Sequence, residues 1–91
     1  MASINLSWNA SPTATAYTVY RSTTAGVRGA PIGVPQPGTT AVDTQFSAGV
    51  TYYYSVTASN SVGEGPASAQ VQFDTPTVPV APTGLTATYV P

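Results

Sequence analysis

The chain has 91 residues, of which 42% are hydrophobic and only 5% are charged, and its net charge is −1. It contains no cysteine and no histidine, which excludes a disulfide framework, a thiolate metal site and a histidine general base. Its two cations, Arg21 and Arg28, are too few to attract nucleic acid or anionic lipid. The length indicates one small domain, whose solubility depends on hydroxyl and amide side chains.

Two strands, each with one buried face, are predicted in the first quarter of the chain. Alternation over residues 3–9 turns three apolar side chains inward, namely Ile4, Leu6 and Trp8. Residues 16–21 alternate in the same way, with Tyr17 and Val19 facing the core. The outward residues of this second strand are Thr18 and Tyr20.

Shorter strands are predicted in the middle of the chain. Residues 31–34 are expected at a sheet edge, because the prolines at 31 and 35 cannot donate hydrogen bonds to a central ladder. Residues 39–43 predict another short strand, with Val42 facing inward. Phe46 is expected to fill the core from the connection that follows.

The strongest strand signal is Tyr52 to Ser59, where aromatic and β-branched residues alternate with smaller polar ones. Its inward side chains are predicted to be Tyr52, Tyr54 and Val56. Residues 60–65 supply the asparagine, serine and glycines of a turn. Residues 69–74 predict a further strand, with Val71 and Phe73 facing inward.

The end of the chain combines a proline-rich connector with one more alternating segment. Residues 75–82 contain three prolines and predict an extended connection, and residues 84–89 alternate with Leu85, Ala87 and Tyr89 in phase. No segment carries a long apolar stripe of helical period. Several short strands between Gly- and Pro-rich turns therefore predict an all-β sandwich or barrel.

The order and spacing of these motifs resemble the fibronectin type III domain, in the bacterial style found beside carbohydrate-active enzymes and in surface proteins. The matching motifs are INLSW at 4–8, YTVYR at 17–21, Phe46 six residues before Tyr52, and the ladder Tyr52, Tyr54, Val56, Ala58, Asn60, Gly63, Gly65 and Ser68. The resemblance covers nearly the whole chain. It implies a seven-stranded, immunoglobulin-like sandwich in which strands A, B and E face strands C′, C, F and G.

The resemblance also assigns two structural side chains. Trp8 would be the core tryptophan of strand B. Tyr52 would be the tyrosine-corner residue of strand F, with its hydroxyl bonded to backbone upstream. Because buried indole and phenol groups normally find partners, both polar groups are expected to be hydrogen-bonded.

One departure from the family concerns the order of the strands. The strand-A motif, PTGLTAT at 82–88, closes this chain instead of opening it. The sequence is therefore interpreted as circularly shifted, either a circular permutant or a slice of a tandem array cut inside one repeat. The expected organisation is strands B to G over 1–75, a connector over 76–82 and a strand-A segment over 83–91.

The strand-A segment is expected to dock through Leu85 and Ala87. Three outcomes remain open for it: closure within its own molecule, donation to a neighbour in a head-to-tail chain, or an undocked tail. Closure within the molecule is sterically possible but requires a taut connector.

The acidic residues do not predict catalysis. Asp43, Glu64 and Asp74 are expected to be solvated loop acids, too scattered for a calcium loop. Even if Asp43 and Asp74 share one pole of the sandwich, they would lie on a convex surface with no base or cation beside them, which does not suit a glycosidase. No histidine or lysine is present to activate a hydroxyl nucleophile. The chain is therefore predicted to be no enzyme and to need no metal or cofactor.

Tyr20 and Tyr53 are expected to lie side by side on the outer face of one sheet. There they would form either a stabilising aromatic pair or a platform for a sugar ring. The first prediction for function is a non-catalytic spacer or scaffold of a bacterial extracellular multidomain protein. Its partners would be adjacent domains or other copies of itself, with no nucleic acid or membrane partner. The alternatives are a carbohydrate- or surface-binding domain, with polysaccharide as partner, and a strand-swapped, self-assembling module.

Location follows from the same reasoning. No run reaches the roughly 18 apolar residues of a membrane span. Met1-Ala2 has no basic and apolar region behind it, so no signal peptide is expected. The sequence predicts either a cytoplasmic chain or a piece of a longer secreted or cell-surface protein, and the resemblance favours the second.

Overall fold

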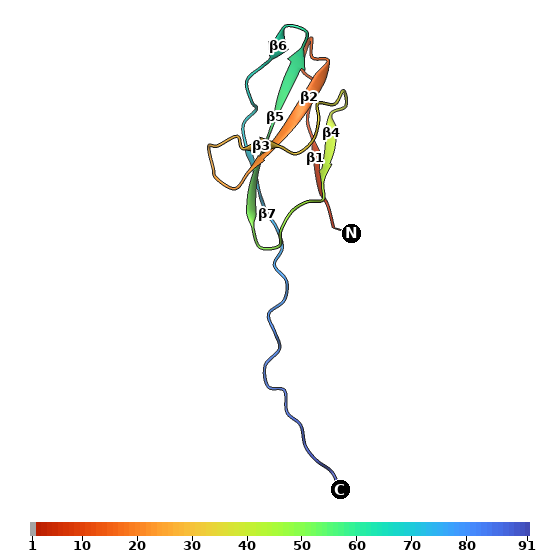
Figure 1. Ribbon diagram of the computed structural model, residues 1–91, viewed down its shortest axis with the longest axis vertical. Helices are drawn as coiled ribbons and strands as arrows, with labels where there is room; N and C mark the ends of the chain where they lie inside the picture. Colours follow the sequence, from red (N-terminus) through yellow and green to blue (C-terminus); the bar gives the residue numbers. More distant parts are fainter. Residues whose placement is uncertain (1) are drawn as a thin grey trace.

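The computed structural model describes residues 2–91 and contains strands and loops but no helix over that range (Figure 1). The strands are β1 (Ile4–Ser7), β2 (Ala16–Ser22), β3 (Ala30–Pro31), β4 (Thr40–Asp43), β5 (Thr51–Asn60), β6 (Gly63–Glu64) and β7 (Val71–Asp74). The predicted all-β class is confirmed.

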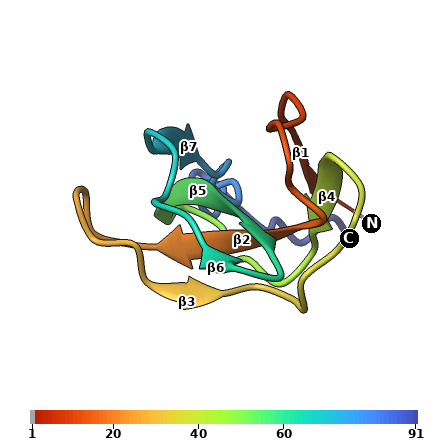
Figure 2. The same ribbon diagram turned by 90° about the horizontal axis from the view of Figure 1, so that it is seen from above.

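The strands form two antiparallel sheets that face one another (Figure 2). In the smaller sheet β1 pairs with β4, with Ile4 opposite Asp43. In the larger sheet β2 lies between β3 and β5. The far edge of β5 pairs with β6 near Asn60 and with β7 near Thr51. This is the arrangement expected of strands B and E facing strands C′, C, F and G.

The core lies between the sheets and is rich in tyrosine. Its buried cluster consists of Ile4, Val19, Tyr52 and Tyr54. Partly buried side chains that pack against it include Leu6, Trp8, Phe46 and Val56. Alternation along β2 and β5 explains the pattern, since every second side chain of a strand points to the same face of its sheet.

Three predicted core positions differ from the structure. Val42 is 59% exposed, because the alternation of β4 turns Ala41 and Asp43 toward the core instead. Val71 and Phe73 pair with Tyr54 and Tyr52, which places them on the inner face as predicted. They nevertheless remain 61% and 40% exposed, because no strand of residues 2–91 on the opposite sheet covers β7.

Two strand boundaries also differ. The edge strand predicted at 31–34 is β3, only Ala30–Pro31. The turn predicted at 60–65 contains β6, which folds back on β5 with Glu64 opposite Ser59. This hairpin brings an acidic side chain onto the larger sheet.

The segment after β7 leaves the sandwich as an extended tail (Figure 1). Thr75 is the last anchored side chain, and its hydroxyl donates to the carbonyl of Val50 at 2.7 Å. The molecule measures 80 × 25 × 18 Å and has a radius of gyration of 19.7 Å. A compact chain of this length would have about 12 Å. The strand predicted at 84–89 is not formed within this single chain.

Candidate functional site

The tyrosine corner implied by the family resemblance is present. The hydroxyl of Tyr52 accepts a hydrogen bond from the backbone N–H of Ser47 at 2.9 Å, and this closes the connection between β4 and β5. The guanidinium of Arg21 lies 4.7 Å from the centre of the Tyr52 ring. The Tyr52 side chain thus joins the polar and apolar parts of the core.

Trp8 behaves differently from the expectation. Its ring packs against Tyr17 with centroids 5.8 Å apart, but its buried Nε1 has no hydrogen-bond partner among residues 2–91. The prediction of a bonded indole is therefore wrong. The ring lies in the wall of an apolar depression between β1 and β7, and no acceptor of residues 2–91 is within reach of Nε1. Tyr17 has a partner, since its hydroxyl accepts from the N–H of Ser11 at 2.8 Å.

Asp43 is the centre of a buried polar cluster that links the two sheets. Its carboxylate accepts hydrogen bonds from the Tyr54 hydroxyl at 2.6 Å, from Arg21 Nη1 at 2.8 Å and from the Gln45 N–H at 3.0 Å. Its side chain is only 2% exposed. The prediction of a solvated acid at this position is wrong, because the inward register of β4 buries the residue.

The surroundings of Asp43 shift two pKa values. Burial alone would raise the pKa of Asp43, but the hydrogen bonds from Tyr54, the Gln45 amide and Arg21 outweigh it and lower that pKa. Burial, reinforced by the hydrogen bond to Asp43, raises the pKa of Tyr54. At neutral pH the cluster therefore holds an ionised carboxylate and a protonated phenol.

Glu64 forms a second carboxylate cluster, on the outer face of the larger sheet. It accepts hydrogen bonds from the hydroxyls of Tyr20 at 2.6 Å and Thr57 at 2.7 Å. Arg28 Nη1 lies 3.7 Å from its other oxygen. The hydrogen bonds from Tyr20 and Thr57 lower the pKa of Glu64, and the same bond to Glu64 raises the pKa of Tyr20.

Arg28 also covers Tyr20, which corrects the expectation of an exposed pair of tyrosines. The Arg28 guanidinium lies 4.3 Å from the Tyr20 ring centre, and Tyr20 is only 8% exposed. Gly29 makes this possible, because it has φ +77° and a Cβ there would overlap the Arg21 carbonyl. Tyr53 is half-buried and lies opposite Ser22, diagonal to Tyr20.

Asp74 completes the set of acids. Its carboxylate accepts hydrogen bonds from Thr51 Oγ1 at 2.9 Å and Gln72 Nε2 at 3.1 Å. Over residues 2–91 no group of three or more acidic side chains is close enough to hold a metal ion. Each carboxylate thus has its own hydrogen-bond donors, and the three carboxylates do not form one cluster.

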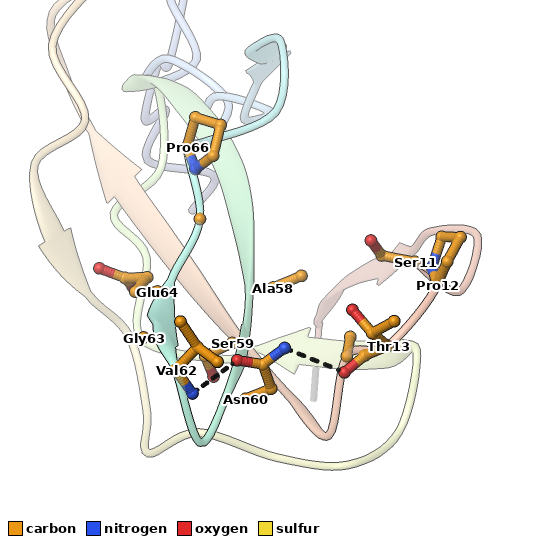
Figure 3. A pocket seen from close by; sticks show the side chains of 12 residues that line it. Ser11, Pro12, Thr13, Ala58, Ser59, Asn60, Val62, Gly63, Glu64 and Pro66 are labelled. Atoms are coloured by element: carbon orange, nitrogen blue, oxygen red, sulfur yellow. Dashed lines mark hydrogen bonds between the residues drawn. The ribbon is translucent and has the colours of Figure 1, made fainter.

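A hollow of mixed polarity lies between the β1–β2 loop and the β5–β6 hairpin (Figure 3), at the end of the sandwich that is uppermost in Figure 1. Asn60 spans it, donating to the Thr13 carbonyl at 3.3 Å and accepting from the N–H of Val62 at 2.8 Å. Its other walls are small residues, and Glu64 at its rim is engaged with Tyr20. The hollow therefore offers little to anchor a ligand.

A second depression is apolar and opens between β1 and β7, and we refer to it as the open groove. It has a volume of about 330 Å³. Its apolar walls are Leu6, Trp8, Val19, Tyr54, Val56, Ala69 and Val71. Figure 2 shows β1 and β7 along the same side of the sandwich, opposite β3. The groove is the strongest candidate for an interaction site, because it joins exposed apolar side chains to the free edge of a strand.

The family assignment follows from sequence comparison together with this fold. The model of the family described as fibronectin type III domain matches residues 2–74. The chain belongs to the fibronectin type III family. The matched residues include every strand of the structure, from β1 to β7.

This fibronectin type III domain is similar to two proteins from bacteria. An amylopullulanase of Thermoanaerobacterium saccharolyticum is 33% identical over 81 residues, which cover 89% of this chain and 6% of that protein. The chain thus spans a small fraction of this relative. The crystal structure of an Fn3-like protein from Clostridium thermocellum is similar, with a TM-score of 0.75 and 35% identity. The match covers 86% of this chain and 81% of that one.

No helix in the described part of the chain is long and apolar enough to cross a membrane.

Sequence reasoning did not find the Glu64 cluster, because the motif Gly63-Glu64-Gly65 resembles an ordinary turn. The signal available in the sequence was the short separation between Glu64 and the end of β5 along the chain. A two-residue reversal after Asn60 places the next residues beside that strand, and therefore beside Thr57 and Tyr20.

Proposed function

We propose that this fibronectin type III domain is a non-catalytic spacer or scaffold module of a bacterial extracellular multidomain protein. The observation that carries the proposal is the state of its acids. Asp43, Glu64 and Asp74 each accept at least two hydrogen bonds from neighbouring groups, and the sequence has no histidine or lysine to act as a base. Carboxylates that are held by donors of the fold, with no base beside them, favour a structural role over proton transfer to a substrate.

The relatives support the same proposal. The similarity to a domain-sized part of an amylopullulanase favours a module carried within a larger chain, and a location outside the bacterial cell. A sugar-binding role for Tyr20 and Tyr53 has less support, since stacking on a sugar needs an open aromatic face and the Arg28 guanidinium lies over Tyr20.

The proposal is tested by incubating the purified chain with starch and with pullulan. We expect no release of reducing ends and no co-sedimentation with insoluble starch. A pullulan-hydrolysing enzyme and a starch-binding protein serve as positive controls. Hydrolysis would contradict the non-catalytic role, and retention on starch would favour the carbohydrate-binding alternative. Tyr20→Ser and Tyr53→Ser would then show whether these two side chains are responsible.

A further inference from the structure

The free edge of β1 is the starting point. β1 pairs with β4 through Ile4 to Ser7, and no strand of the described residues pairs with its other edge. The backbone N–H and C=O groups along that edge are available to an added strand. They border the open groove, so an incoming strand would find both hydrogen-bonding groups and apolar side chains.

Apolar side chains in the groove, and beside it along β7, are uncovered. Val71 is 61% exposed and Phe73 is 40% exposed, although both face the inner side of the larger sheet. Trp8 and Leu6 line the opposite wall and are only partly buried. One strand laid beside β1 would cover Leu6, Trp8 and Val71 in the walls of the groove and would extend the smaller sheet toward β7. Phe73 lies two residues further along β7, on the same face as Val71.

The tail of the chain has the pattern that such a strand requires. In residues 83–89 the side chains of Leu85, Ala87 and Tyr89 alternate with Gly84, Thr86 and Thr88. Leu85 is 95% exposed and Tyr89 is 86% exposed, so both are available for packing. An antiparallel strand on β1 would turn the first set toward the groove and the threonines toward solvent.

The direction of the tail indicates which molecule receives it. β1 begins, and β7 ends, at the lower end of the sandwich, and the tail continues downward from there (Figure 1). A strand antiparallel to β1 must start at the upper end. The tail would have to reverse its course to reach that point in its own molecule.

The connector disfavours such a reversal. Residues 76–82 include Pro76, Pro79 and Pro82 and contain no glycine, asparagine or aspartate. Proline-rich segments of this kind are stiff and extended, at about 3.1 Å per residue. The connector therefore carries the tail strand about 20 Å beyond the sandwich, toward the place where the upper end of a second copy would lie.

We propose that residues 83–89 of one molecule add as a strand to β1 of a second molecule and fill its open groove. The donor and acceptor surfaces are different, so the contact is head-to-tail and leaves a free tail at one end and a free groove at the other. With a net charge of only −1 there is little repulsion between copies. This inference is independent of the proposed spacer role, since it concerns assembly and not catalysis or sugar binding.

The first test is the molar mass of the purified chain, measured by light scattering over a wide range of concentration. We expect the mass to rise with concentration from 9.2 kDa through multiples of that value. Leu85→Asp should hold the mass at one chain, whereas Thr86→Asp, with the same charge on the opposite face of the segment, should assemble like the unmodified protein. A concentration-independent mass of one chain would overturn the proposal, and so would undiminished assembly of Leu85→Asp.

The second test separates the donor from the acceptor. Val71→Asp alters the groove but keeps the tail, and because Val71 is 61% exposed this change should leave the isolated sandwich folded. Each of Val71→Asp and Leu85→Asp should be monomeric alone, and an equimolar mixture should form dimers of about twice 9.2 kDa. Val42→Asp, which alters an equally exposed valine outside the groove, should assemble normally. A mixture that stays monomeric would contradict strand donation.

Discussion

Asp43 and Glu64 have nearly the same partners in very different surroundings. Each carboxylate accepts a hydrogen bond from a tyrosine hydroxyl at 2.6 Å, and each has an arginine beside it. The Asp43 side chain is 2% exposed and lies 2.8 Å from its arginine, whereas the Glu64 side chain is 37% exposed and lies 3.7 Å from its arginine.

From this difference we expect burial, more than the identity of the partners, to decide how much a polar cluster contributes to stability. Asp43 joins β4 of one sheet to β2 and β5 of the other, so its bonds to Arg21 and Tyr54 are made only when the sandwich closes. Glu64 joins β6 to β2 and β5 within a single sheet, where water competes for the same groups. Removing one member of a buried ion pair leaves the other uncompensated, which is the more costly event.

The largest effect is expected for Asp43→Ala. This change leaves Arg21 and the Tyr54 hydroxyl without their shared acceptor and should lower the free energy of unfolding by about 3 kcal/mol. Urea denaturation followed by circular dichroism measures it. Asp74→Ala removes a carboxylate from an exposed position and is the matched control, with little change expected. Equal midpoints for the two variants would contradict the importance of burial.

A smaller effect is expected for Tyr54→Phe. The ring still fills the core, but Asp43 loses one of its three donors, which should lower the free energy of unfolding by about 1 to 2 kcal/mol. Tyr53→Phe on the same strand is the control, because Tyr53 is only half-buried. The same denaturation assay compares them, and a larger loss for Tyr53→Phe would reverse the interpretation.

The Asp43 cluster should also set the pH range of stability. The pKa of Asp43 is lowered in the folded state, so the unfolded chain binds the proton more tightly and stability falls as the pH drops below about 4. The pKa of Tyr54 is raised in the folded state, so stability falls again as the pH rises above about 10. Thermal melts across this range test both limits. Tyr54→Phe should weaken the alkaline one.

The smallest change in stability is expected for Glu64→Gln, for which the unfolding midpoint should stay within the scatter of repeat measurements. Its effect should appear in a titration instead. The hydrogen bond to Glu64 raises the pKa of Tyr20, so this variant should return the pKa toward the usual value of a tyrosine. Ultraviolet or NMR titration measures the shift. An unchanged titration would show that the bond is absent in solution.

The sequence predicted those features of the fold that depend on local alternation. The main strands β1, β2, β5 and β7, the inward tyrosines of β5 and the tyrosine corner at Tyr52 follow from period-two patterns and from the family motif. The strand β6 was predicted as part of a turn. The register of β4 was missed. Its four residues include only one large apolar side chain, Val42, so the pattern suggested an inward valine where the structure buries Asp43.

The candidate site was predictable only in part. The motif at 82–88 predicted a strand that docks through Leu85 and Ala87, and this docking stays a prediction, since residues 83–89 form no strand within the described chain. The burial of Tyr20 could not be inferred, since it depends on Arg28 from the loop between β2 and β3 and on Glu64 from the β5–β6 hairpin. Such contacts depend on the path of a loop, and the alternation of side chains along one strand carries no information about that path.

The position of Trp8 gives the molecule a built-in optical probe. It is the only tryptophan in the chain, its ring forms part of the groove wall, and its Nε1 has no partner among residues 2–91. A strand that covers the groove would further exclude water from the indole and shift its fluorescence to shorter wavelength. The emission of the unmodified protein should therefore report how many grooves are filled, without any added label.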